Sequence, residues 1–88
     1  MFQNLQILEL SSVLAGPSVG LFVAELGAKV IKVENSRTGG DITRKWKLAS
    51  ENKDENQLSA YYCSANWNKE VLFADFTQAE DRQKIYDL

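Results

Sequence analysis

Residues 12–17, Ser-Val-Leu-Ala-Gly-Pro, and residues 24–34, Ala-Glu-Leu-Gly-Ala-Lys-Val-Ile-Lys-Val-Glu, carry the strongest structural signal in this chain. They predict the end of a strand, a Gly-Pro turn, a helix that stops at a glycine, and a second strand. Pro17 suits the first helical position, where a missing N–H costs nothing, and Gly27 suits the left-handed residue that ends a helix. Two parallel strands joined by a right-handed crossover helix form a βαβ unit, whose first turn is a common place to bind phosphorylated ligands.

The residues around this turn support the same unit. Residues 5–10, Leu-Gln-Ile-Leu-Glu-Leu, predict the first strand, and residues 29–34, rich in β-branched side chains, predict the second. Between the strands, apolar residues recur at helical spacing and predict a stripe that faces the sheet. The members of this stripe are Val19, Phe22, Val23 and Leu26.

The second half of the chain predicts one more strand and further helix. Residues 35–55 are polar and irregular, which predicts a long surface loop with a short turn near residues 44–48. Residues 57–65 fit either a short helix or an extended segment, and residues 71–76 fit a third strand. Thr77 and Glu80 match a capping box, which predicts a helix from there to the end. The expected fold is α/β, a single domain over residues 1–88 with a Rossmann-like βαβ unit and a short parallel sheet.

Composition excludes several classes of function. The chain has 88 residues, a formal net charge of −2 and no histidine. It therefore offers no general attraction to nucleic acid or to an anionic membrane, and it cannot hold a Ser-His-Asp triad or a His-based zinc site. No run of 18 apolar residues is present to span a membrane. The single Cys63 has no partner for a disulfide or a metal site, which predicts a reducing, cytoplasmic location.

Two features predict that the chain is the first part of a larger protein. The last expected helix meets neither a glycine cap nor a trailing proline before Leu88. Three parallel strands would also leave open sheet edges and incompletely covered faces. The alternative is a small module whose last helix frays at its C-terminus.

The same residues also resemble a known family. The segments that carry the resemblance stand in the family's order and near its spacing, and they cover nearly all of the chain. They are residues 12–17 and 24–34, Gly39–Trp46 (Gly-Gly-Asp-Ile-Thr-Arg-Lys-Trp), Ala60–Tyr62, Asn66–Lys69 and Asp75–Thr77. The chain resembles the N-terminus of the class III CoA-transferases (CaiB/BaiF type), which include formyl-CoA and carnitine CoA-transferases and α-methylacyl-CoA racemase. The resemblance implies coenzyme A as a bound substrate and no metal.

The resemblance implies a set of CoA-binding residues. Val13 and Ala15 would contact CoA at the first turn, beside Gly16, whose missing Cβ leaves room for a phosphate at a helix N-terminus. Arg37 follows the second strand, where members often place an arginine at the adenine and phosphate end. Ala74, at the end of the third strand, matches a position that contacts CoA in relatives.

Three positions depart from the family pattern. Leu14 stands where some formyl-CoA-type members carry a glutamine, which argues against specificity for oxalate or formate. Glu70 stands where members usually carry an arginine, and Thr77 where they often carry a lysine. The last two departures predict a weaker contact with phosphate.

The resemblance also bears on catalysis. The family's catalytic residue is an aspartate that attacks the acyl-CoA thioester to form a mixed anhydride, and no aspartate of this chain aligns with it. Asp41 is instead predicted to be structural, in an Asx-type turn or an ion pair with Arg44. This chain is therefore expected to contain no catalytic residue.

The expected function is that of an N-terminal fragment of a class III CoA-transferase, which moves CoA between an acyl-CoA and a carboxylic acid. The fragment is expected to be inactive alone. One alternative is a fragment of an acyl-CoA racemase, and another is a non-catalytic structural remnant that dimerises. The expected partners are CoA or acyl-CoA, together with a second copy of the chain or the remainder of the fold.

Overall fold

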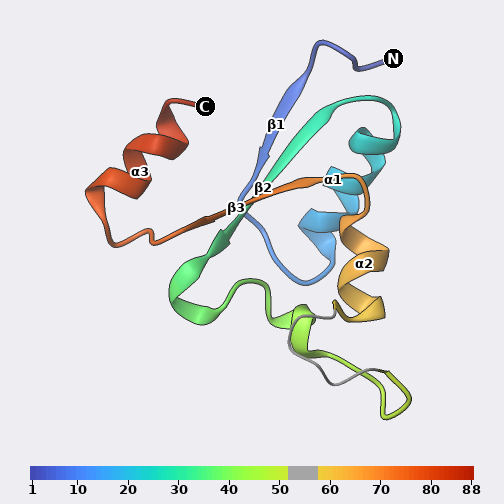
Figure 1. The fold of residues 1–88 in the computed structure, drawn as a ribbon. Coiled ribbons are helices and arrows are strands. Elements are labelled where there is room, and N and C mark those ends of the chain that lie inside the picture. The colour runs from blue at the N-terminus through green and yellow to red at the C-terminus, as the bar shows by residue number, and fades with distance from the viewer. Residues whose placement is uncertain (52–57) are drawn as a thin grey trace.

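A computed structural model describes residues 1–51 and 58–88, so Gln57, where the second predicted helical segment starts, lies outside the described residues. Three strands, three α-helices and two short 3-10 helices follow one another within the described ranges (Figure 1). In chain order they are β1 Gln6–Glu9, α1 Ala15–Glu25, β2 Lys29–Asn35, η1 Ser36–Thr38, η2 Ile42–Lys45, α2 Ala60–Asn66, β3 Glu70–Ala74 and α3 Ala79–Tyr86.

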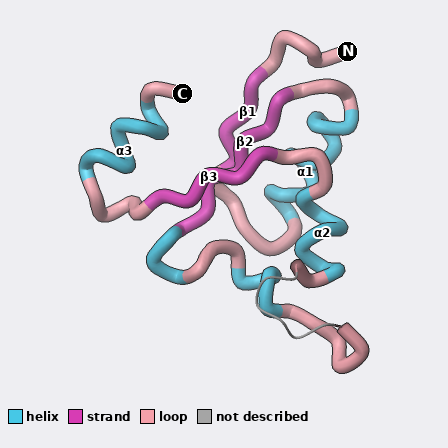
Figure 2. Tube along the Cα trace, viewed as in Figure 1, coloured by secondary structure: helices cyan, strands magenta, loops and turns pink. Residues whose placement is uncertain are grey.

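The strands form one parallel sheet in the order β1-β2-β3, with β2 in the centre (Figure 2). Leu8 of β1 is opposite Ile31 of β2, and Val33 of β2 is opposite Leu72 of β3. Helix α1 connects the first two strands, and α2 precedes the third. The predicted α/β fold with a short parallel sheet is confirmed.

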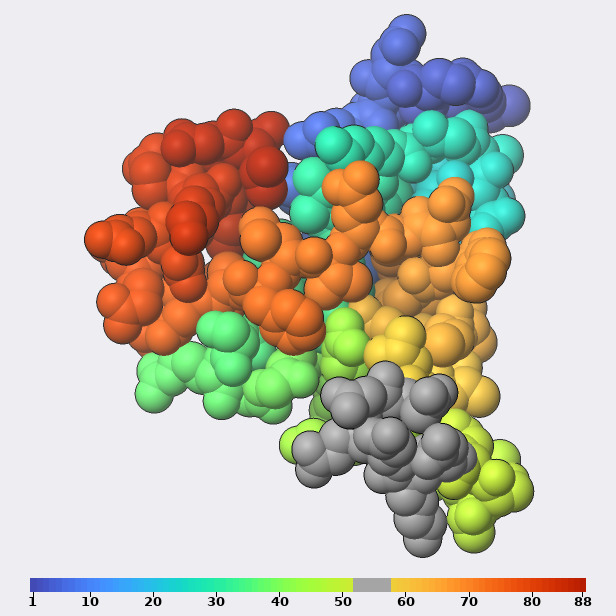
Figure 3. Space-filling view, in the orientation of Figure 1, coloured from blue at the N-terminus to red at the C-terminus, as the bar shows by residue number. Residues whose placement is uncertain are grey.

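The helices cover the two faces of the sheet unequally. Helices α1 and α2 contact one another on one face, whereas α3 lies across the other (Figure 1). Apolar residues of β2 join a small core on each side. Beneath α1 the buried cluster is Ala24, Ala28 and Val30, and beneath α3 it is Ile31, Val33, Ala74 and Ile85. In the space-filling view α3, in red, forms the left flank of the molecule (Figure 3).

The predicted apolar stripe of α1 is wrong in part. Val19 and Phe22 are each 66% exposed, although the other two members of the stripe are partly buried. The helix buries small residues instead, because it lies close to charged side chains on the sheet. A Cβ at Gly20 would collide with Glu9 Oε1 of β1. The residues of α1 that are buried are Pro17, Gly20 and Ala24.

Three predicted helix boundaries have different outcomes. The predicted Gly-Pro turn is wrong, because α1 already begins at Ala15 and Pro17 is its third residue rather than its first. Gly27 follows α1 with φ +102°, as predicted for a left-handed residue at that point. The capping box at Thr77 is wrong, because α3 begins at Ala79 and its N-cap residue, Gln78, makes no side-chain hydrogen bond. Both the N–H and the hydroxyl of Thr77 donate instead to Asp75 Oδ1, at 2.9 and 2.6 Å.

No helix within residues 1–51 and 58–88 has the length and apolar character needed to cross a membrane.

Candidate functional site

The candidate site lies where the three strands end. Carboxyl ends of parallel strands meet at one edge of a sheet, and open α/β sheets bind ligands there. Two neighbouring hollows open at this edge, with volumes of about 430 and 340 Å³. Asn35, Thr38 and Phe76 line both hollows, so the two hollows are adjacent.

The turn between β1 and α1 borders the larger hollow, which Ser11 and Ser12 line. Val13 has φ +70°, a left-handed conformation that a β-branched residue rarely adopts. Its N–H points at the carboxylate of Asp41, 3.4 Å from Oδ1 and 3.3 Å from Oδ2. Such backbone strain persists only where the surroundings impose it, so the buried aspartate fixes the shape of this turn.

The predicted contact residues Ala15 and Gly16 lie in the first turn of α1. Ala15 is exposed, and Gly16 is partly buried. A Cβ at Gly16 would overlap the hydroxyl of Ser11, so packing within the turn already requires glycine there. The helix start offers N–H groups and positive partial charge to an anion.

Arg37 and Ala74 lie at the other side of the same edge. Arg37 is exposed in η1 and lines the smaller hollow together with Asp75. Ala74 ends β3 opposite Asn35, but its side chain is only 4% exposed and packs in the core under α3. Any contact of Ala74 with a ligand would therefore use its backbone rather than its methyl group.

Beneath the turn lies a buried cluster of four charged side chains, which we call the four-charge cluster: Glu9, Lys32, Asp41 and Lys69. Lys32 Nζ is 3.1 Å from Glu9 Oε2 and 3.0 Å from Asp41 Oδ2. Lys69 Nζ is 2.8 Å from Glu9 Oε1. The side chains of both lysines and of Asp41 are 0% exposed, and that of Glu9 is 5% exposed. Two positive and two negative charges balance, so the cluster offers no net charge to a ligand.

The electrostatics of the cluster follow from burial and pairing. Burial lowers the pKa of Lys69 below its ordinary value of 10.5, against the opposing effect of Glu9. For Asp41, burial alone would raise the pKa. Hydrogen bonds from Thr43 and from Lys32 outweigh burial and hold the pKa below its ordinary 3.8. Asp41 is thus favoured in its charged form.

A second buried network joins Glu34, Arg44 and Tyr62 on the same face. Arg44 makes a two-point contact with Glu34, with both N–O distances at 2.7 Å, and the Tyr62 hydroxyl donates to Glu34 Oε2 at 2.7 Å. Burial would raise the pKa of Glu34, but the bonds from Arg44, the Asp41 N–H and Tyr62 together hold it below 4.5. Burial and the bond to Glu34 raise the pKa of Tyr62, so its hydroxyl keeps its proton.

The prediction for Asp41 is half right. Its carboxylate accepts from the N–H and the hydroxyl of Thr43, at 3.0 and 2.8 Å, as an Asx-type turn requires. Its ion-pair partner, however, is Lys32 rather than Arg44, which pairs with Glu34. The Asx-type turn predicted for Asp41 is confirmed.

Sequence reasoning missed Glu9, Lys32, Glu34 and Lys69 as partners in these networks. The sequence contains one indication of these networks, because a parallel strand that is buried on both faces is normally an unbroken apolar run. In β2 the apolar run is interrupted at Lys32 and Glu34, two residues apart and therefore on one face. That spacing indicates a polar layer beneath the helices.

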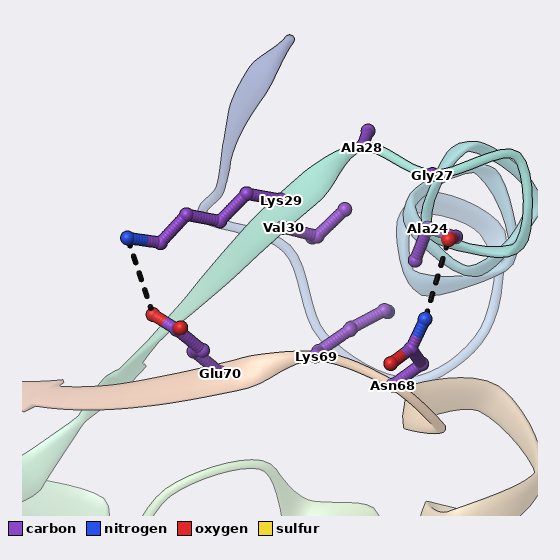
Figure 4. Close-up of a pocket in the computed structure, with 8 residues that line it drawn as sticks. All are labelled: Ala24, Gly27, Ala28, Lys29, Val30, Asn68, Lys69 and Glu70. Carbon is purple, nitrogen blue, oxygen red and sulfur yellow. Dashed lines mark hydrogen bonds and ion pairs between the residues drawn. The ribbon is translucent and has the colours of Figure 1, made fainter. Parts of the chain in front are cut away.

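A separate hollow of about 380 Å³ lies at the opposite edge of the sheet, between the end of α1 and the start of β3 (Figure 4). Asn68, with φ +64°, turns the chain into β3 and donates to the carbonyl of Ala24 at 3.3 Å. Because this hollow lies at the amino ends of β2 and β3, it is a poorer place for a ligand.

The arrangement suits binding more than bond-breaking. Residues 1–51 and 58–88 contain no group of three or more histidine, cysteine or carboxylate side chains placed to hold a metal. The carboxylates of Glu34 and Asp41, nearest the larger hollow, are already occupied by cations and N–H groups. The edge therefore offers a helix start, one exposed arginine and an open cavity.

Comparison with known proteins identifies the family to which the chain is similar. The model of CoA-transferase family III matches residues 2–88. An acyl-CoA transferase of Fusarium pseudograminearum is 41% identical over 89 residues, which is 97% of this chain and 19% of that protein. A succinate–glutarate CoA-transferase of Agrobacterium fabrum is 42% identical over 88% of this chain and 20% of its own length.

Solved structures agree on the fold. A CAIB/BAIF family protein from Brucella suis superposes with a TM-score of 0.83 at 37% identity, covering 94% of this chain and 21% of the other. The three-stranded unit matches the N-terminal portion of that fold. The chain thus spans about a fifth of the length of the relatives it matches.

Proposed function

This chain belongs to CoA-transferase family III, and from that premise we propose that residues 1–88 form one domain that supplies part of a coenzyme A site to a class III CoA-transferase. In this proposal the turn at Val13, Ala15 and Gly16 meets one part of CoA. Arg37 meets the adenine and phosphate end, and the backbone at Ala74 contacts CoA. The chemistry is transfer of CoA between an acyl-CoA and a carboxylic acid.

One observation carries the proposal. The β1–α1 turn and Arg37 lie at the same carboxyl edge of the sheet, where Ser11 and Ser12 of the turn line the larger of two adjacent hollows and Arg37 lines the smaller. A helix start and a guanidinium group are the two protein features that most readily bind phosphate oxygens. CoA carries a diphosphate and a 3′-phosphate, so it offers more than one group for such an edge.

The proposal is tested by thermal unfolding of the 88-residue chain with and without millimolar CoA, under reducing conditions because Cys63 is exposed and free. A ligand at one hundred times its dissociation constant adds about 2.7 kcal/mol, which raises the midpoint by several degrees in a domain of this size. Arg37→Ala should reduce the shift. Lys45→Ala is the matched control, because it removes the same charge from an exposed side chain outside both hollows. An unchanged midpoint would contradict the proposal.

We propose that this chain alone has no turnover, because the family's catalytic aspartate has no counterpart in it. Mixing the chain with an acyl-CoA and a carboxylic acid should leave both unchanged by chromatography. Formation of a new acyl-CoA would refute this part of the proposal. The free thiol of Cys63 is consistent with a cytoplasmic location.

A second candidate function is non-catalytic association, as a homodimer or with further chain. Exposed apolar side chains favour it, since Phe22 on α1 and Trp67 after α2 are 66% and 70% exposed. Such side chains are typical of interaction surfaces when they gather in a patch. Light scattering coupled to size exclusion distinguishes the candidates, because association without a CoA-dependent shift would favour this one.

A further inference from the structure

The four-charge cluster has a feature that charge pairing alone does not explain. Three of its members also hold the backbone of residues 11–17, which comprise the turn after β1 and the first three residues of α1. Lys32 Nζ donates to the carbonyl of Ser11 at 3.1 Å, and Lys69 Nζ donates to the carbonyl of Pro17 at 2.8 Å. Between these points, the N–H of Val13 donates to Asp41 at 3.3 Å. This segment is therefore held at its start, middle and end.

We propose that Lys32, Asp41 and Lys69 are positioning residues that fix the segment of residues 11–17, the turn and the start of α1, in the shape in which it receives its ligand. They come from three separate elements: β2, the N-cap position of η2, and the residue before β3. A turn held by three elements cannot adjust on its own. This inference rests on the proposed CoA site, and it assigns the shape of that site to residues that do not touch the ligand.

The backbone shows why such a device is needed. A valine at φ +70° is in a strained backbone conformation and would relax to an extended or helical conformation if released. Leu14, the N-cap residue of α1, makes no side-chain cap hydrogen bond, so local capping does not hold the helix start. The hydrogen bonds from Lys32, Asp41 and Lys69 hold the backbone in this conformation.

The composition of the cluster supports positioning over stability. A buried ion pair is weak evidence for stability, because removing charges from water costs about as much as their attraction returns. Every buried side-chain nitrogen and oxygen in residues 1–51 and 58–88 nevertheless has a hydrogen-bond partner. Glu9 bridges the two lysines through separate oxygens, so the donors that hold the two ends of the turn are themselves oriented by one carboxylate.

The test measures the turn directly, by amide hydrogen exchange of the 88-residue chain. The first variant is Lys69→Met, which keeps an unbranched side chain and removes the bonds to Pro17 and Glu9. The second is the charge-balanced pair Glu9→Gln with Lys69→Met, in case the single variant leaves Glu9 unpaired and the chain unfolds. Tyr62→Phe is the matched control, because it removes a buried polar group from the neighbouring network without touching the turn.

In the positioning variants, amide exchange at Val13 and Ser18 should accelerate about tenfold or more, the size expected for losing a hydrogen bond to a charged group. Amides of β3 and α3 should be unchanged after correction for global stability, and Tyr62→Phe should leave the turn as in wild type. Uniform acceleration across the chain, or an unchanged turn in a folded variant, would overturn the inference.

The dissociation constant for CoA is measured on the same samples. If the wild-type chain binds CoA, the balanced pair should weaken binding about fivefold or more, since its turn is no longer held at Pro17. Equal affinity with a loosened turn would overturn the link between positioning and binding. If the wild-type chain does not bind CoA, the proposed function fails for this chain, and the exchange data still decide whether these residues hold the turn.

Discussion

The two faces of β2 bury side chains of opposite character. Towards α3 the strand presents Ile31 and Val33, which pack with Ile85 in an apolar cluster. Towards α1 and α2 it presents Lys32 and Glu34, both at most 3% exposed and both in ion pairs. One strand of seven residues therefore supports two kinds of interior.

The two faces contribute to the fold in different ways, one through apolar burial and the other through paired charges. An apolar face gains stability through burial and tolerates changes of shape. A charged face gains little net stability, but it requires each partner to be in place because an unpaired buried charge is costly. The charged face is also the one that holds the β1–α1 turn. The face of β2 towards α3 thus contributes stability, and the face towards α1 and α2 fixes the position of the β1–α1 turn.

The largest expected effect is on the charged face. Lys32→Ala would leave Glu9 and Asp41 buried without their shared cation, which typically costs about 3–5 kcal/mol. Urea unfolding followed by circular dichroism should show a chain that is largely unfolded without denaturant. A loss below about 1 kcal/mol would mean that water or rearrangement replaces the lysine, and the contrast between the faces would be lost.

On the apolar face, Ile31→Ala should cost about 2–4 kcal/mol through lost burial and the cavity left behind. The matched control is Val71→Ala on β3, whose side chain is 40% exposed and which should cost less than about 1 kcal/mol. The measurement is the same urea titration. If Ile31→Ala were as mild as its control, α3 would not be packed on the sheet as described.

Much of this fold was open to prediction from the sequence, for a physical reason. The glycine at position 27 and the β-branched run at residues 29–34 are local signals, and the structure contains the helix end and the strand that they predict. The Gly-Pro pair correctly marks the region where the helix starts, but both residues lie inside α1 rather than in a turn before it. The family resemblance also depends on such local segments.

The charged networks were not predicted, because they join residues far apart in sequence. Lys69 meets Glu9 across 60 positions, and Tyr62 meets Glu34 across 28. The same reason explains the error at Val19 and Phe22, since helical spacing marks an apolar face but cannot show that small residues are needed against Glu9. The site residues Val13, Ala15, Gly16, Arg37 and Ala74 remain predictions.

Lowering the pH should reduce the free energy of unfolding through the charged groups beneath α1 and α2, and not through the apolar face of β2. The pKa of Glu34 and that of Asp41 are lower in the folded chain than their ordinary 4.5 and 3.8, so the unfolded chain takes up these protons first as pH falls. The stability that these groups contribute is therefore complete above the ordinary values, and it is lost as pH falls through the folded ones. Urea unfolding between pH 7 and pH 3 measures the loss.

Two variants separate the contributions to this pH dependence. Tyr62→Phe removes one donor from Glu34, so its unfolding free energy should fall less steeply with acid. Ile31→Ala lies on the apolar face and should show the wild-type dependence displaced to lower stability at every pH. A wild-type slope in Tyr62→Phe, or a changed slope in Ile31→Ala, would contradict the assignment of acid sensitivity to the charged face.

The smallest expected effect compares two lysines of the same strand. Lys29 lies 3.8 Å from Glu70, and the two side chains are 55% and 65% exposed. An exposed pair gains little in water and is screened by salt, so Lys29→Ala should change the unfolding free energy by less than about 0.5 kcal/mol. Any change should shrink further in 0.5 M salt, whereas the effect of Lys32→Ala should persist, because its partners are buried. Equal effects at the two positions would show that residue type, rather than burial, determines the cost, and the contrast between the two faces of β2 would then need another cause.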